Sequence, residues 1–363
     1  MTEFTNKVNI IREFLEAQKI DALLLRRVSS FAWATCGAAS YINTASTDGI
    51  ASLLVTQKNL YLITNTIEAP RLDKEEKLAA QGWEFRVFPW HAASTVLDDL
   101  TPGLKLGTDL PYPGAIDLSE EVSRLRTNLT PEEGDRFKFL GKVCAEAMDK
   151  AIHAIRPGMT EFEIAALLDQ EAQSRSAQPI VNLIATDQRI FSYRHPLPTS
   201  KKLDRYAMLV LCGRRAGLVC SITRLVHFSA LPAELRRKAD AVAGVDAVFI
   251  EATRPGQKIN DIFQRATTAY ADFGFPDEWR LHHQGGPAGY EAREYLATPE
   301  VTDTVRVGQT YAWNPSITGT KSEDTILVGD SGNEVLTTIP DWPKIQVEVQ
   351  GKTISRPDIL VIK

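Results

Sequence analysis

The sequence lacks the features that mark secreted, membrane-spanning and nucleic-acid-binding proteins. Only four of its 363 residues are cysteine and they are scattered, which is typical of reduced thiols in a cytoplasmic protein. No apolar run approaches the ~20 residues that span a bilayer, and the acidic, helix-patterned start is not that of a signal peptide. No block of lysine and arginine stands out. We therefore expect a cytoplasmic protein with neither a membrane nor a nucleic acid as partner.

The composition is that of an ordinary globular protein. Hydrophobic residues make up 44% of the chain and charged residues 24%, with a formal net charge of −5. A chain of 363 residues is long enough for two domains. Such a length can bury a large core without metal ions or disulfides.

The amino-terminal part alternates helical and strand patterns. Residues 10–18 are amphipathic with helical spacing. Short apolar runs of strand length follow at residues 21–25, 50–56, 60–64, 84–88 and 104–109. This order predicts an α/β domain whose sheet is covered by helices.

Two helix starts open the remainder of the chain. Thr130-Pro131-Glu132-Glu133 and Thr160-Glu161-Phe162-Glu163 each place a capping threonine before acidic residues. They predict helices to about residues 155 and 175, and a second helix pair is expected at residues 233–251 and 259–273. Strands are expected at residues 207–212, 218–223, 309–314 and 324–328. We predict a smaller domain at residues 1–127 and a pseudo-symmetric α+β domain at residues 128–363.

Five stretches of the second domain occur in a specific order: YRHPLPT (193–199), GLVCSITR (217–224), HHQGGPAGYEARE (282–294), YAWNPSI (311–317) and KSEDTILV (321–328). Together they resemble the motifs of the pita-bread (M24) family, which includes creatinase, Xaa-Pro aminopeptidase, prolidase and methionine aminopeptidase. The resemblance implies a pita-bread catalytic domain preceded by a creatinase-type α/β domain. It also implies two metal ions held by Asp, Asp, His, Glu and Glu.

Most of those ligand positions carry other residues here. The first Asp falls on Val210 or Leu211, and Ser221, Gly286 and Asn314 replace the next three ligands; Glu323 alone matches. A dinuclear site needs several carboxylates to balance two dications. Arg293, at the position of a family histidine, adds positive charge. We therefore expect no catalytic metal and no other cofactor.

His195 is the principal catalytic candidate. The resemblance implies that it shuttles a proton near the scissile bond, and histidine can accept and donate a proton near neutral pH. Pro196 and Pro198, which follow His195, restrain the backbone of this segment. The plainer interpretation is a loop histidine without a role.

Glu323 and Glu294 are the other catalytic candidates, because each could orient an NH-bearing group of a substrate. Lys321, two residues before Glu323, could instead pair with it, and the sequence does not decide between the two. The residues expected to bind substrate are His282, His283, Arg293, Arg224, Tyr311, Asn314, Lys321 and Trp33. For Arg224 a structural salt bridge is an equal alternative, and His282 and His283 could form a hydrogen-bonded pair without chemistry.

Creatinase is the family's precedent for hydrolysis without metal. The leading hypothesis is therefore a metal-independent hydrolase that cleaves a C–N bond in a small polar substrate, amino-acid-like or with a guanidino or amide group. One alternative is a Xaa-Pro aminopeptidase-like peptidase with an atypical metal site. Another is a pseudoenzyme that binds a peptide or protein, and a lyase is also compatible with His195. The resemblance further implies a homodimer in which Trp33 approaches the partner's site, although a tryptophan in the core is the safer interpretation.

Overall fold

The computed structural model describes residues 2–362. The chain divides into two compact units, Met1–Arg126 and Thr127–Lys363. This division falls one residue before the boundary expected from the sequence. Within residues 2–362 no helix has the length and apolar character needed to cross a membrane.

The first unit is built on a six-stranded mixed sheet. The strand order is β4-β3-β2-β1-β5-β6, and β1 (Ala22–Arg27) pairs with β2 (Asp48–Thr56) and β5 (Leu106–Thr108). The outer strands are β3 (Leu60–Asn65), β4 (Glu84–Phe88) and β6 (Ile116–Asp117). The helices are α1 (Glu3–Gln18), α2 (Val28–Ala34), α3 (Ala69–Lys74), α4 (Leu78–Gln81), α5 (Val96–Leu100) and α6 (Ser119–Arg126). The predicted α/β class of this unit is confirmed.

Local capping fixes where the long helices of the second unit begin. Thr130 and Glu133 form a capping box at the start of α7 (Pro131–Ala154), and Thr160 and Glu163 form another at α8 (Glu161–Ser174). Both helix starts were predicted, the second of them as a capping box, because the reciprocal hydrogen bonds join residues only three apart. The second helix pair is α10 (Ala233–Ala252) and α11 (Ile259–Asp272).

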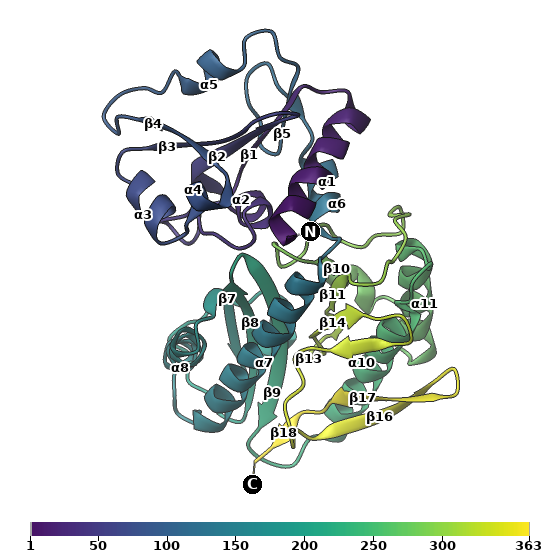
Figure 1. The fold of residues 1–363 in the computed structure, drawn as a ribbon. Coiled ribbons are helices and arrows are strands. Elements are labelled where there is room, and N and C mark those ends of the chain that lie inside the picture. Colours follow the sequence, from purple (N-terminus) through teal and green to yellow (C-terminus); the bar gives the residue numbers. More distant parts are fainter. Residues whose placement is uncertain (1, 363) are drawn as a thin grey trace. The chain divides into compact units, whose positions relative to one another are not determined.

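Two four-stranded sheets carry the motifs. The first has the order β18-β9-β8-β7 and contains β7 (Gln178–Thr186), β8 (Tyr206–Arg215), β9 (Leu218–His227) and β18 (Leu360–Val361). The second has the order β10-β11-β14-β15 and contains β10 (Gly285–Ala288), β11 (Thr310–Trp313), β14 (Asp324–Val328) and β15 (Asn333–Val335). Helices α7 and α8 lie along the first sheet, and α10 and α11 lie beside the second (Figure 1).

The two sheets meet at Thr223 and Glu323. An isolated antiparallel bridge joins these residues, and the Thr223 amide donates to the carbonyl of Glu323 at 3.2 Å. Short strand pairs flank this junction: β12 (Ser316–Ile317) with β13 (Thr320–Lys321), and β16 (Lys344–Val349) with β17 (Lys352–Pro357). Residues of the motifs 217–224 and 321–328 therefore meet where β9 and β14 approach each other.

Candidate active site

The β8–β9 hairpin presents one face to Glu323. Val210 lies opposite Thr223 and Cys212 opposite Ser221, so these four side chains share a face of the sheet. The Thr223 hydroxyl donates to Oε2 of Glu323 at 2.5 Å. Cys212 Sγ lies 3.3 Å from Ser221 Oγ. Val210 and Ser221, the positions aligned with the family's two aspartates, therefore lie on the face of the hairpin that contacts Glu323.

Two side-chain cations neutralise Glu323, which is 2% exposed. Lys321 Nζ lies 2.8 Å from Oε2, and Arg293 Nη2 lies 2.9 Å from Oε1. Burial would raise the pKa of Glu323, but the charges of Lys321 and Arg293 outweigh it and lower the pKa to about 2. The pairing of Lys321 with Glu323, left open by the sequence, is present in the structure.

The residues at the family's ligand positions do not fit a dinuclear metal centre. The side chain of Val210 has no atom that can bind a metal ion. Ser221 Oγ already accepts a hydrogen bond from Arg293 Nη1 at 3.0 Å. Gly286 has φ +156°, and a Cβ there would lie 2.5 Å from the carbonyl oxygen of Tyr295, so no histidine fits without a backbone shift. The one carboxylate of the set is held by two cations, and the amide of Asn314 carries no charge.

Three histidines gather beside this ion cluster. His195 follows the short helix α9 (Gln188–Ser192), and His282 and His283 lie between η1 (Glu278–Leu281) and β10. The Nε2 atoms of His195 and His282 are 3.0 Å apart, and one ring nitrogen from each of the three lies within 4.8 Å of the others. His195 is exposed, whereas His282 and His283 are partly buried.

The surroundings favour neutral imidazoles. Burial, followed by the charge of Lys321, lowers the pKa of His282 to about 2. Burial, followed by Arg293 and Lys321, lowers the pKa of His283 to about 4. The same two causes, burial and Lys321, lower the pKa of His195. A neutral imidazole keeps a lone pair that can accept a proton or bind a metal ion.

A buried carboxylate holds the loop that carries His195. Glu161 Oε2 accepts hydrogen bonds from the amide (3.0 Å) and hydroxyl (2.7 Å) of Thr199 and pairs with Arg189. Arg189 also donates to the carbonyl of Leu197 at 3.0 Å. In the sequence Glu161 stood out only as an acidic residue between Thr160 and Glu163, which form the capping box. No local spacing links it to Thr199, 38 positions away.

Asn314 contributes an unpartnered acceptor. Its backbone N–H donates to the backbone carbonyl of Gln284 at 3.1 Å. Its side-chain Oδ1 is buried and has no hydrogen-bond partner within the described residues. A buried polar atom of this kind is costly unless a ligand or water satisfies it.

Other sequence-predicted residues contact the surrounding structure. Glu294 Oε1 accepts the amide protons of Tyr290 (2.7 Å) and Glu291 (3.3 Å). The Tyr311 hydroxyl donates to Gln309 at 2.9 Å. In the first unit, Trp33 is 1% exposed, and Lys7 Nζ lies over its ring at 5.6 Å. All three side chains contact neighbouring groups of the protein, and their expected roles in catalysis or substrate binding stay predictions.

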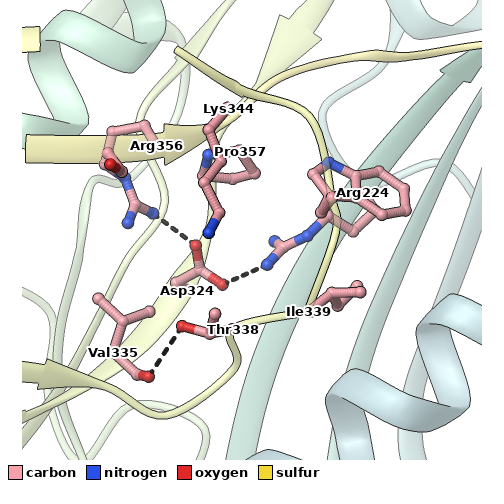
Figure 2. Close-up of a pocket in the computed structure, with 10 residues that line it drawn as sticks. Arg224, Asp324, Val335, Thr338, Ile339, Lys344, Arg356 and Pro357 are labelled. Atoms are coloured by element: carbon pink, nitrogen blue, oxygen red, sulfur yellow. Dashed lines mark hydrogen bonds and ion pairs between the residues drawn. The ribbon is translucent and has the colours of Figure 1, made fainter. Parts of the chain in front are cut away.

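Arg224 belongs to a buried ion network on the other face of β14 from Glu323. Its Nη2 lies 2.8 Å from Asp324 Oδ1, and Arg356 Nη2 lies 2.5 Å from Oδ2 of the same carboxylate, as Figure 2 shows. Arg224 Nη1 also donates to the carbonyl of Glu323 at 3.2 Å. These contacts agree with the alternative that Arg224 forms a structural salt bridge. The network fixes the strand that carries Glu323, and nothing in the sequence pattern had indicated Arg356.

Together, two helix pairs, two sheets and five motifs in this order define the pita-bread class of protein. Residues 135–330, more than half of the chain, match the family model of metallopeptidase family M24. The chain belongs to this family, and the resemblance and fold class predicted from the sequence are confirmed. By family it is a hydrolase of C–N bonds, as expected.

Individual relatives are distant. The chain is 22% identical over 359 residues to a Xaa-Pro dipeptidase of Pyrococcus horikoshii, a match that covers 93% of this chain and 98% of the relative. It is 23% identical over 234 residues to an uncharacterised peptidase of Staphylococcus saprophyticus, covering 61% of this chain and 65% of that protein. A Xaa-Pro dipeptidase structure from Bacillus anthracis superposes with a TM-score of 0.80 at 19% identity, covering 99% of this chain and 100% of the other.

Proposed function

We propose that this protein hydrolyses the C–N bond of a short peptide-like substrate, an Xaa-Pro dipeptide or a related amide, with His195 as general acid and base. The names of the relatives support a peptide-like substrate more than a guanidino compound. The observation that carries the proposed mechanism is the ion cluster of Glu323, Lys321 and Arg293 beside the exposed imidazole of His195.

The charge of the cluster matches a substrate that carries a carboxylate. Lys321 and Arg293 both pair with the single carboxylate of Glu323, which leaves one positive charge uncompensated among the three. The carboxyl terminus of a dipeptide would balance that charge. A guanidinium can also hold a carboxylate through two parallel hydrogen bonds.

In the proposed reaction His195 accepts a proton from a water molecule whose oxygen attacks the substrate carbonyl carbon. The C–N bond then breaks, and the imidazolium returns the proton to the leaving nitrogen. Arg293 stabilises the negative charge that develops on the carbonyl oxygen. The unpartnered Oδ1 of Asn314 accepts a hydrogen bond from an N–H group of the substrate.

A second candidate is the same hydrolysis carried out with a metal ion at an atypical site. Two observations favour it: the matching family model is that of metallopeptidase family M24, and one ring nitrogen from each of the three histidines lies within 4.8 Å of the others. The two candidates share the substrate class and differ in whether turnover needs a metal ion.

The deciding assay measures proline release from Ala-Pro by chelator-treated protein, with and without added Mn²⁺ or Zn²⁺. We expect turnover in the presence of chelator and its loss in His195→Ala, because the proton shuttle is gone. His91→Ala removes an exposed histidine of the first unit and serves as the matched control.

Turnover that depends on added metal would replace the metal-free mechanism with the second candidate. Unchanged turnover in His195→Ala would remove His195 as the acid and base. If neither Ala-Pro nor any other dipeptide or small amide is hydrolysed under either condition, the proposed reaction is wrong.

A further inference from the structure

We propose that His195, His282 and His283 form a binding site for one divalent transition-metal ion, of the Zn²⁺, Ni²⁺ and Cu²⁺ class, separate from the five ligand positions of the family. None of the three histidines occupies one of those positions. The site shares His195 with the proposed acid–base step. The expected effect of the metal ion on turnover therefore rests on the proposed function.

The geometry of the ring nitrogens supports a single ion. Zinc–imidazole bonds are about 2.0–2.1 Å long, so the nitrogens of a tetrahedral site lie about 3.3 Å apart. Here one ring nitrogen from each histidine lies within 4.8 Å of the other two, and His195 Nε2 and His282 Nε2 are 3.0 Å apart. Small rotations of the three rings would bring one nitrogen of each to bonding distance from a single ion.

Two of the ligands are held in place by a buried amide. The side-chain Nε2 of Gln284 donates to the carbonyl oxygens of His282 (2.6 Å) and Trp279 (3.0 Å), and its Oε1 accepts from the Tyr270 hydroxyl (2.8 Å). Gln284 is fully buried. This support fixes the backbone of the His282–His283 pair, and the Glu161 ties restrain the loop of the third ligand.

Unpartnered nitrogens are a second, independent observation. The Nδ1 atoms of both His282 and His283 are buried and have no hydrogen-bond partner within the described residues. Unsatisfied buried polar atoms are rare in folded proteins and call for a bound ion, a water molecule or a role in catalysis. An ion bound through the Nδ1 atoms of His282 and His283 would supply the missing partner of each ring.

The donor chemistry selects the class of metal. Three imidazoles and no carboxylate suit zinc, nickel and copper, whereas magnesium and calcium require oxygen ligands. The charges of Lys321 and Arg293 oppose a bound cation, and Glu323, at 2.8 and 2.9 Å from them, offsets one of the two. The three imidazoles therefore have to bind the ion against one remaining positive charge. A three-histidine site also leaves a coordination position open for water or substrate.

Binding would block the proposed reaction. The lone pair with which His195 would bind the ion is the one that would accept the proton from water, so an occupied site has no general base. We therefore expect added Zn²⁺ to inhibit metal-free hydrolysis, and a chelator to restore it.

The test is zinc titration of chelator-treated full-length protein by calorimetry, with elemental analysis after gel filtration. We expect one equivalent to bind and His283→Ala to weaken the affinity by at least about tenfold, since one of three ligands is lost. His153→Ala, which removes an exposed histidine on α7, is the matched control and should bind like the wild type. Thermal unfolding of each variant checks that it folds.

A spectroscopic readout distinguishes a built site from scattered surface binding. The Cu²⁺-loaded protein should show nitrogen hyperfine splitting from histidine ligands in electron paramagnetic resonance, and His283→Ala should change it. Sub-stoichiometric binding, or a His283→Ala variant with unchanged affinity, would overturn the metal site and leave the proposed hydrolysis standing. One bound equivalent that activates turnover would support the site and overturn the metal-free mechanism instead.

Discussion

Glu323 shows how single residues set the chemistry of this cleft. In the family's metal enzymes the corresponding carboxylate binds dications, whereas here Lys321 and Arg293 lie at 2.8 and 2.9 Å from it. A buried carboxylate without partners would become protonated, because burial disfavours its charged form. The two side-chain cations therefore keep Glu323 ionised.

Lys321→Met tests this balance. Removing one cation leaves Glu323 buried with only Arg293 and Thr223 as partners, so we expect the free energy of unfolding to fall by about 1–3 kcal/mol. Urea denaturation measures it. Lys58→Met, at an exposed turn, should stay within about 0.5 kcal/mol of the wild type. Equal stability of the two variants would contradict the neutralising role of Lys321.

Among the secondary-structure elements, α8 and the loop 193–199 act as a unit. Glu161 at the first position of α8 binds both backbone and side chain of Thr199, and it also accepts the amide of Thr186 at 2.8 Å at the end of β7. This single carboxylate thus ties a helix, a strand and the His195 loop together. Glu161 is a positioning residue that acts through the loop.

Glu161→Gln should lower kcat by about 10–100-fold with a smaller change in KM, because the base is less well placed. Glu163→Gln, in the same turn but exposed, is the matched control for helix capping and should keep most of the activity. Equal kcat in Glu161→Gln and the wild type would show that the loop does not depend on this carboxylate.

The charge of Glu161 also predicts a pH dependence of stability. Burial raises its pKa, but hydrogen bonds from Arg189, Thr199 and Thr186 outweigh burial and hold the pKa below the ordinary 4.5. The stabilisation is therefore present above pH 4.5 and lost as the pH falls through the lowered folded-state value. Between about pH 5 and 3 the wild type should lose more stability than Glu161→Gln, as measured by thermal unfolding.

On the scale of the second unit, a buried ion network joins distant parts of the chain. Arg356, on the carboxy-terminal hairpin β16–β17, pairs with Asp246 on α10 (2.7 Å) and with Asp324 on β14 (2.5 Å), and all three are at most 3% exposed. Figure 2 shows Asp324 between Arg356 and Arg224. The network connects the hairpin to the strand next to Glu323.

Arg356→Met should destabilise the protein by about 3–5 kcal/mol, because it leaves two carboxylates buried near one another with too few cations. Arg205→Met, at an exposed position, is the control. Chemical denaturation measures the difference. Destabilisation of less than 1 kcal/mol would show that the carboxylates find other partners.

The predicted homodimer stays a prediction. Trp33, the residue expected to contact a partner, is 1% exposed and lies in the core of the first unit, so the core alternative describes its position. The same holds for Arg224, whose contacts are structural. For both residues the resemblance to the family gave a candidate role. Which groups each side chain contacts depends on how the chain packs.

The sequence by itself determined the features that depend on local spacing or on residue type. The two capping boxes, the α/β order of the first unit and the replacement of metal ligands at four positions all follow from residues read one by one or three apart. Tertiary structure alone decided which charges meet: Lys321 with Glu323, Glu161 with Thr199, Arg356 with Asp324, and His195 with His282, 87 residues away. Those pairs form only when strand register and sheet packing bring distant segments together, and no local pattern encodes that distance.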